Sequence, residues 1–235
     1  ANVNTTGFKK DRAVFEDLLY QNIVPAGGQV DAESETPTGL MLGTGTRVVA
    51  TEKLHAQGNI ITTENALDLA ISGDGYFSVQ QADGTIAYSR DGSFKLSAEG
   101  NLVTAGGQTL LPAITVPQNA ASLTIGRDGV VTVELSNGGG SSQIGQLQLS
   151  RFVNNSGLQP IGRNLMQQTN ASGDPLVALP GADGAGQLMQ GALEASNVNV
   201  VEEMVNMIET QRAYEVNSKA ISAADGMLRF LNNNL

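Results

Sequence analysis

The side chains that could do chemistry are few. The 235-residue chain has one histidine, His55, and no cysteine. This composition excludes thiol catalysis, disulfides and Cys-based metal sites. A serine–histidine relay would have to use His55, and a zinc site would find no second soft ligand. The surrounding EKLHAQG carries neither a nucleophile elbow nor metal-ligand spacing, so we interpret His55 as a surface or packing residue.

Other candidate sites also have simpler interpretations. The stretch GTGTRV from Gly43 lacks the third glycine and the following helix of a dinucleotide-binding loop. The Asp-Gly pairs at 83, 91 and 128 stand outside any alternating acidic Ca²⁺ loop and are expected to form turns. Glu202 and Glu203 complement the dipole of a helix start. The sequence therefore predicts no catalytic residue, no cofactor, no metal and no enzymatic activity.

Charge and hydropathy narrow the possible partners. With 13 basic and 23 acidic residues, the formal charge is −10, and no basic cluster interrupts it. Such a chain repels nucleic acid and anionic lipid. No apolar run approaches the ~20 residues that span a bilayer, and the first residues do not read as a cleavable signal. We therefore expect neither nucleic-acid binding nor membrane insertion.

The middle of the chain predicts an antiparallel β-domain. Apolar residues alternate with period two, and Gly-Asp-Gly at 73–75 and the three Asp-Gly pairs supply the positive φ of tight hairpin turns. Strands are expected at 67–71, 77–79, 86–88, 94–96, 123–125, 130–135 and 144–152. We assign residues 66–184 to this domain, with a Gly/Pro/Ala-rich linker at 169–186, and expect 66–169 to fold alone.

The flanking segments, 1–65 and 185–198, are assigned to a connecting region between helical and β parts. Within it, AVFEDLLYQNI at 13–23 is apolar but undecided between helix and strand. Residues 21–45 form a polar Pro/Gly loop with apolar anchors at both ends. A loop of this length is usually functional or disordered. We expect it to reach a neighbouring subunit.

The segment 199–235 predicts a long helix, with Asn199 as N-cap and Glu202 as its reciprocal partner. One apolar stripe crosses its first turns, and a second follows with the 3-4-3-4-3 spacing of a coiled-coil seam. The two stripes point in different directions, so the helix needs neighbours on two sides. A core helix laid across the β-domain is the alternative. The predicted subunit-interface residues are Val201, Met204, Val205, Ile208, Ala213, Val216, Ala220, Ala223, Met227 and Phe230. The fold class is mainly β with a long C-terminal α-helix and an extended, discontinuous terminal region.

Several long motifs carry a resemblance. ANVNTTGFKK resembles the motif that follows the first helix of bacterial flagellar rod and hook proteins, through Asn2, Thr5, Gly7 and Phe8. SNVNVVEEMVNMIETQRAYEVNSKAI is similar to their C-terminal signature, which includes Gln211, Arg212 and Tyr214. GDGYFSV and YSRDGSFKLSAEGNLVTAGG resemble their middle-domain hairpins. RAVFEDLLYQNIVPAGGQ, GTGTRVVATEKLHAQGNI and TIGRDGVVTV are most similar to the distal rod members. The resemblance implies that a further helix precedes Ala1, so we expect this sequence to be either a truncated chain or a partly observed one.

The resemblance implies a structural subunit of the distal rod, a hollow helical drive shaft that transmits torque to the hook. One stripe would meet the preceding helix of its own chain and the other the helices of neighbours. The implied partners are copies of itself in a helical homopolymer, proximal rod proteins, a hook or hook-junction protein, outer ring proteins acting as a bushing, and a rod cap. The implied location is the flagellar basal body, from periplasm to outer membrane, after export by the flagellar secretion apparatus.

Competing interpretations stay open at this point. A hook protein or a proximal rod subunit is the alternative within the family. A secreted carbohydrate-binding β module could be built from the same hairpins, although such sites usually present aromatic platforms and this chain has no Trp and four Tyr. A hydrolase using Asp or Glu pairs in the β-domain is the third alternative.

Overall fold

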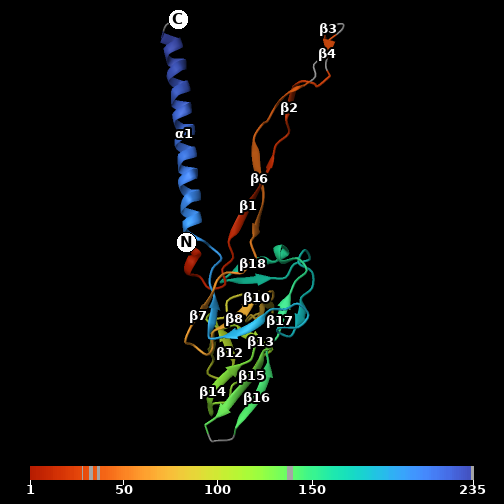
Figure 1. The fold of residues 1–235 in the computed structure, drawn as a ribbon, viewed down its shortest axis with the longest axis vertical. Helices are drawn as coiled ribbons and strands as arrows, with labels where there is room; N and C mark the ends of the chain where they lie inside the picture. The colour runs from red at the N-terminus through yellow and green to blue at the C-terminus, as the bar shows by residue number, and fades with distance from the viewer. Residues whose placement is uncertain (28, 32–33, 36–37, 137–139, 234–235) are drawn as a thin grey trace.

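The computed structural model describes residues 1–27, 29–31, 34–35, 38–136 and 140–233. A β-rich body lies at one end of an elongated molecule, and two arms rise from it (Figure 1). One arm is the helix α1 (Val200–Asn233), and the other is a ribbon built on β1 (Asp11–Asp17) and β6 (Thr46–Lys53). The N-terminus, with the short 3-10 helix η1 (Asn2–Asn4), lies at the foot of α1.

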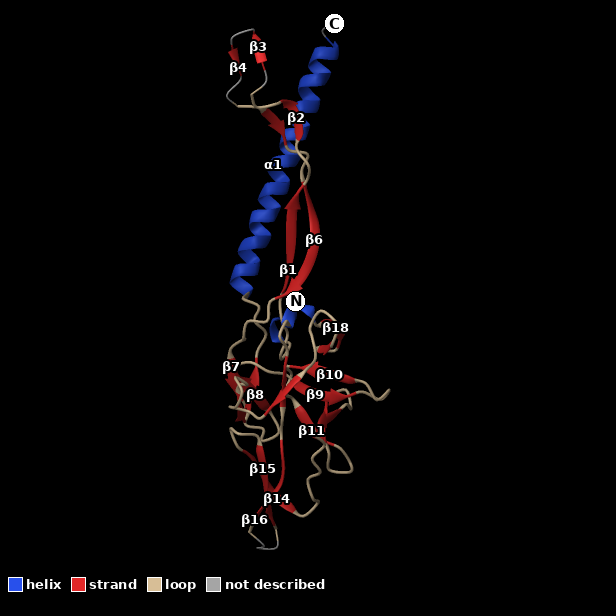
Figure 2. Cartoon of the chain, turned by 90° about the vertical axis from the view of Figure 1, so that its right-hand side faces the viewer, coloured by secondary structure: helices blue, strands red, loops and turns tan. Residues whose placement is uncertain are grey.

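The body contains one large antiparallel sheet and one small one. The large sheet has the order β11-β12-β13-β9-β10-β19-β18, and the small sheet has the order β14-β15-β16 at the end away from the arms (Figure 2). The strands of the large sheet are β9 (Phe77–Gln80), β10 (Ile86–Ser89), β11 (Phe94–Leu96), β12 (Leu102–Thr104), β13 (Thr109–Leu111), β18 (Gln159–Gly162) and β19 (Leu165–Gln167). Those of the small sheet are β14 (Ala120–Ile125), β15 (Val130–Leu135) and β16 (Ser141–Gln146).

Three two-stranded pairs complete the body and bring late segments onto early ones. These are β8 (Leu69–Ser72) with β21 (Gln187–Gln190), β7 (Ile60–Thr62) with β22 (Ala192–Glu194), and β17 (Leu149–Arg151) with β20 (Leu176–Ala178). The linker predicted at 169–186 is therefore wrong, because this stretch contains β20 and buries Ser172, Ala178 and Ala185. The Gly and Pro residues that suggested a linker serve turns between packed strands.

The core fills the body in two clusters. The larger cluster includes Phe77 and Phe94, whose rings meet edge to face at 5.1 Å between centroids. The smaller cluster is Tyr76, Tyr88, Phe152, Leu158 and Met166. The period-two pattern is confirmed at Phe77 and Val79, which are fully buried on either side of a half-buried Ser78.

Two of the three predicted Asp-Gly turns are confirmed, with φ of 84° at Gly84 and 81° at Gly129. Gly92 differs, because its φ is not positive. An added Cβ there would lie 1.7 Å from the carbonyl oxygen of Leu69, so Gly92 is needed where these two segments of the backbone approach closely. The predicted strand at 144–152 is split into β16 and β17, and between them the N–H of Leu147 donates to the carbonyl of Gly129 (2.8 Å).

The ribbon resolves the undecided segment at 13–23 as strand. β1 pairs with β6, with a bulge between Val14 and Phe15, and β2 (Gln21–Val24) pairs with β5 (Leu40–Leu42). A further short pair, β3 (Gln29–Asp31) with β4 (Ser34–Glu35), lies beyond them. The loop predicted at 21–45 is therefore partly wrong, since it begins and ends as a hairpin. Residues 28, 32–33 and 36–37 of that prediction lie outside the described residues.

The helix begins where the sequence predicted. The N–H of Val201 donates to the side-chain oxygen of Asn199 at 3.0 Å, as expected of an N-cap. The expected reciprocal partner, Glu202, has its carboxylate 3.4 Å from the ammonium of Lys10. Every residue from Val200 to Phe230 except Glu203 is exposed, so the alternative of a core helix is wrong. Over the part of the chain that the structure describes, no helix is long and apolar enough to cross a bilayer.

Candidate assembly surface

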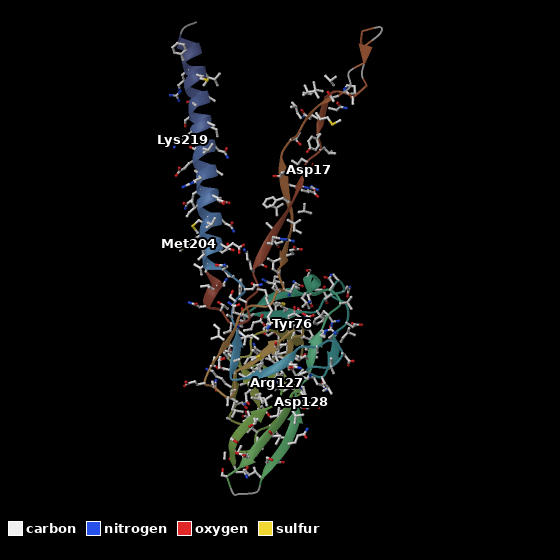
Figure 3. The ribbon with its side chains drawn as sticks, viewed as in Figure 1. Asp17, Tyr76, Arg127, Asp128, Met204 and Lys219 are labelled. Atoms are coloured by element: carbon white, nitrogen blue, oxygen red, sulfur yellow. The ribbon has the colours of Figure 1, made fainter. Side chains whose placement is uncertain are left out.

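The two predicted stripes of α1 lie on a helix that stands clear of the body. Figure 3 shows Met204 and Lys219 on this arm and Asp17 on the ribbon, whereas Tyr76 lies within the body. All ten predicted interface residues are exposed, with Val201 at 69% of its accessible surface. Leaving so many large apolar side chains in water is unfavourable, and such patches mark sites of protein contact. These residues are therefore accessible to a partner, and their contact with other subunits stays a prediction.

A second apolar surface covers the ribbon, where sequence reasoning expected only the segment 21–45 to reach a neighbouring subunit. Its members are exposed residues of the paired strands and of the segment 18–20 between β1 and β2, and they include Phe15 at 64% and Leu19 at 91%. The others are Tyr20, Ile23, Val24, Leu40, Met41, Leu42, Val48 and Val49. The apolar content of AVFEDLLYQNI could have indicated this surface. Its periodicity did not distinguish a helix from a strand, because both faces of the ribbon lie in solvent.

The ribbon is held in register by three cross-strand ion pairs. Arg12 pairs with Glu52, Arg47 with Glu16, and Lys53 with Asp11 at 2.8 Å. Directly opposed charges of opposite sign stabilise an antiparallel pair modestly. The paired residues are direct partners in the strand register. Because most of these side chains are at least partly exposed, the ion pairs add little to the stability of the body.

The N-terminal family motif forms the turn beneath the helix. Gly7 has φ of 65°, and an added Cβ would lie 2.6 Å from the backbone nitrogen of Asp91, so only glycine fits. Its N–H donates to the carbonyl of Glu194 (2.8 Å). Thr5 accepts at its carbonyl from the N–H of Phe8, and its own N–H donates to the carbonyl of Asn2, both at 3.3 Å. This turn ties the start of the chain to the strand that precedes α1.

A groove of about 570 Å³ separates this motif from the first turns of α1. Asn2, Phe8 and Gln211 line it together with Met207, so the structure brings three of the motif residues to one place. Arg212 and Tyr214 are exposed, with Tyr214 at 76%. The Phe8 ring also lies 5.4 Å from the ammonium of Lys53, a cation–π distance.

A buried charge cluster lies where the arms join the body. The carboxylate of Glu194 contacts the ammonium of Lys9 at 2.5 Å and Nη1 of Arg90 at 3.2 Å, and it accepts from the N–H of Gly58 at 2.9 Å. All three charged side chains are buried. Burial lowers the pKa of Lys9, and the hydrogen bond that Lys9 donates to Glu194 opposes that shift. Sequence reasoning missed this cluster because its members are distant in the chain.

His55 is a packing residue, as predicted. Its Nδ1 lies 2.8 Å from the Tyr76 hydroxyl, and the two rings meet edge to face. Burial, and then the charges of Lys9, Lys53 and Arg90, lower the pKa of His55 to about 4, so it is uncharged at neutral pH. Burial raises the pKa of Tyr76 to about 12. No cluster of three potential metal ligands occurs within the described residues.

The body offers no aromatic platform of the kind that binds sugars. Among the described residues, the highly exposed aromatic side chains are Phe15, Tyr20, Tyr214 and Phe230, and all of them lie on the two arms. Tyr76, Phe77, Tyr88, Phe94 and Phe152 are buried in the body. The geometry therefore favours contact along the arms over ligand capture by the body.

Comparison with known proteins agrees with this geometry. The family model described as Flagellar hook protein FlgE/F/G D1 domain matches residues 70–133, and that described as Flagellar basal body rod FlgEFG protein C-terminal matches residues 189–234. The chain is 54% identical to flagellar basal-body rod protein FlgG of Buchnera aphidicola subsp. Acyrthosiphon pisum, over 98% of this chain and 89% of that protein. It is 46% identical to the FlgG of Borreliella burgdorferi and 39% identical to that of Bacillus subtilis, each over 99% of this chain and 89% of the relative.

Proposed function

Since the chain belongs to the family of flagellar basal-body rod proteins and is a structural subunit of the distal rod, we propose that it assembles through its two arms into a helical shaft. The observation that carries this proposal is the exposure of α1 from Val200 to Phe230, with Glu203 the one exception in that range, which leaves the apolar stripes accessible to solvent. Burying a Val, Ile or Met side chain contributes about 1.5–3 kcal/mol, so covering the stripes in an assembly favours association.

The two stripes suit two kinds of neighbour. One would contact a helix preceding residue 1 in the same subunit, seated along the groove lined by Asn2, Phe8, Met207 and Gln211. The other would contact helices of adjacent copies, where the small Ala213, Ala220 and Ala223 permit close approach. Because such contacts use different surfaces on each partner and do not close, they generate a helical filament with the helices inside.

The ribbon supplies a second set of contacts between copies. Its exposed apolar residues lie on strands that project well beyond the body (Figure 1). Placed against a neighbour, they would resist the sliding between subunits that bending of a shaft requires. This is the property that distinguishes a rigid rod from a flexible hook.

The remaining partners follow from the position of a rod in the basal body. We propose proximal rod proteins below, a hook or hook-junction protein above, outer ring proteins around the shaft as a bushing, and a rod cap during growth. The shaft would run from periplasm to outer membrane and carry motor torque to the hook. Export through the flagellar secretion apparatus would deliver the subunit, and no catalytic activity or cofactor is required of it.

Helical reconstruction of filaments grown from the full chain tests this proposal. The expected result is a tube with α1 in its inner layer, the body outside, and the ribbon against a neighbouring copy. A filament in which α1 lies on the outer surface, or in which the bodies alone make the contacts, would contradict it.

A further inference from the structure

The two arms leave the body through one polar junction, which we define as Lys9, Arg90, Glu194 and Asn197. Lys9 precedes the ribbon, Arg90 belongs to the body, and Glu194 and Asn197 precede α1. The junction therefore joins all three parts of the molecule, through hydrogen bonds between residues up to 187 positions apart.

Glu194 makes the buried half of this junction. Its carboxylate contacts Lys9 and Arg90 and accepts from Gly58, and Lys9 also donates to the carbonyl of Ala56 (2.8 Å). Two cations thus share one carboxylate among the described residues. A buried ion pair adds little net stability, but removing one partner leaves an uncompensated buried charge, which is strongly unfavourable. This arrangement therefore specifies one geometry.

Asn197 makes the half that faces the arms. Its side-chain oxygen accepts from the N–H of Lys10 (2.8 Å), at the start of the ribbon. Its side-chain nitrogen donates to the carbonyls of Leu54 (2.7 Å) and Ala56 (3.1 Å), where the ribbon returns. One side chain thus holds both strands of the ribbon two residues before the helix cap at Asn199.

Close backbone contacts leave this junction little freedom. An added Cβ on Gly58 would lie 2.0 Å from the carbonyl oxygen of Ala195, and the N–H of Ala195 donates to the carbonyl of Asn59 (2.8 Å). The ammonium of Lys10 also reaches Glu202 and Glu203 in the first turn of α1. The helix start is consequently tied to the ribbon by side chains and by backbone.

We propose that Glu194 and Asn197 are positioning residues that fix the direction in which α1 leaves the body relative to the ribbon. Neither residue belongs to an apolar stripe. They act by holding the two surfaces at one mutual angle, so that both meet their neighbours in the same subunit. The consequence for rod growth rests on the proposed function, whereas the angle itself is a property of the single chain.

The angle between α1 and the ribbon is tested by electron–electron double resonance, which measures the distance between two spin labels on the full chain. Because the chain has no native cysteine, each label attaches only to an introduced cysteine. Labels are placed at Thr51→Cys on the ribbon and Glu209→Cys on the helix, both exposed. The parent is expected to give one narrow distance distribution. Glu194→Gln should broaden it, because the loss of a buried counter-charge lowers the equilibrium favouring the docked arrangement on the order of 100-fold.

The controls separate positioning from folding. Glu134→Gln removes an exposed carboxylate on β15 and should leave the distribution unchanged. Glu194→Asp keeps the charge and should give a distance distribution narrower than that of Glu194→Gln. If Glu194→Gln does not fold, Asn197→Ala, at a half-buried site, provides the same measurement. Distributions in both variants as narrow and identically centred as the parent's would overturn the proposal, and so would a parent distribution as broad as theirs.

Rod growth is then measured separately in cells. Variants with broadened distances are expected to grow fewer rods while their bodies stay folded, as a cooperative melt of the purified variant shows. If the distances broaden as expected but the gene proves dispensable for the rod, the proposed function fails and the positioning role stands. Rods of normal length and number from Glu194→Gln, despite broadened distances, would refute the role in growth.

Discussion

Leu188 lies directly opposite Ile71 across the antiparallel pair β8–β21, and both side chains are buried in the main core. Residues that follow the expected end of the β-domain thus complete its hydrophobic interior. The body depends on chain segments that the sequence pattern had placed outside it.

Truncation measures this dependence. Removal of residues 170–235 should abolish the cooperative melt of the body, because it deletes β20, β21 and β22 with the buried Leu188 and Ala192. Removal of residues 200–235 alone should leave the melt intact, since α1 contributes nothing to either core cluster. The predicted loss of the melt on removing residues 170–235 replaces the expectation that residues 66–169 fold alone. An unchanged melt after the longer truncation would restore it.

A point substitution tests the same contact. Leu188→Ala removes a fully buried side chain and should lower the free energy of unfolding by about 2–5 kcal/mol. Met189→Ala, at the next position of β21 but exposed, is the matched control and should cost much less. Equal losses from the two variants in denaturant titrations would count against the assigned register.

The seam of α1 is tested by a charge. Ala220→Glu should block rod growth, because burying an unpaired carboxylate between helices costs several kcal/mol. The melt of the body should not change, since Ala220 is exposed in the single chain. Ser218→Glu lies on the opposite side of the helix from the seam and is the control for added charge. Normal swimming by an Ala220→Glu strain would exclude the seam from the interface.

The outer ribbon is tested by deletion. Removing residues 26–38 leaves β2 and β5 joined through Pro25 and Gly39, so the ribbon shortens without losing its base. The filament should become more curved and more flexible, which electron micrographs measure directly. A Gly/Ser segment of equal length in place of 26–38 distinguishes loss of contacts from loss of length. A deleted rod as straight and stiff as the parent would eliminate the stiffening role.

Acid should lower the free energy of unfolding through His55. Its pKa falls from 6.5 to about 4 in the folded chain, so between these values the unfolded chain takes up the proton and the folded chain does not. The contribution of neutral His55 to the free energy of unfolding is complete above pH 6.5 and is lost as the pH falls towards 4. It amounts to about 2 kcal/mol once residual exposure is allowed for. His55→Gln should flatten the unfolding free energy over this range relative to the parent, and identical pH profiles would contradict the assignment.

Local pattern predicted those elements whose partners are close in sequence. The hairpins around Gly84 and Gly129 followed from alternation and turn residues, because in each of them a strand pairs with the next strand along the chain. The helix start followed from Asn199, and the exposed stripes from helical periodicity. The family motifs completed the functional assignment, since they are long and occur in order.

The tertiary structure decided everything that depends on distant pairing. QLMQ at β21 and ALE at β22 are too short to show a period, and they become strands only because β8 and β7 present unpaired edges to them. The ribbon was undecided because both of its faces lie in solvent, so no buried face imposed alternation. Lys9, Arg90 and Glu194 are unremarkable charges in sequence. They become a junction because folding excludes water from all three, and a buried charge must find its counter-ion wherever in the chain that counter-ion lies.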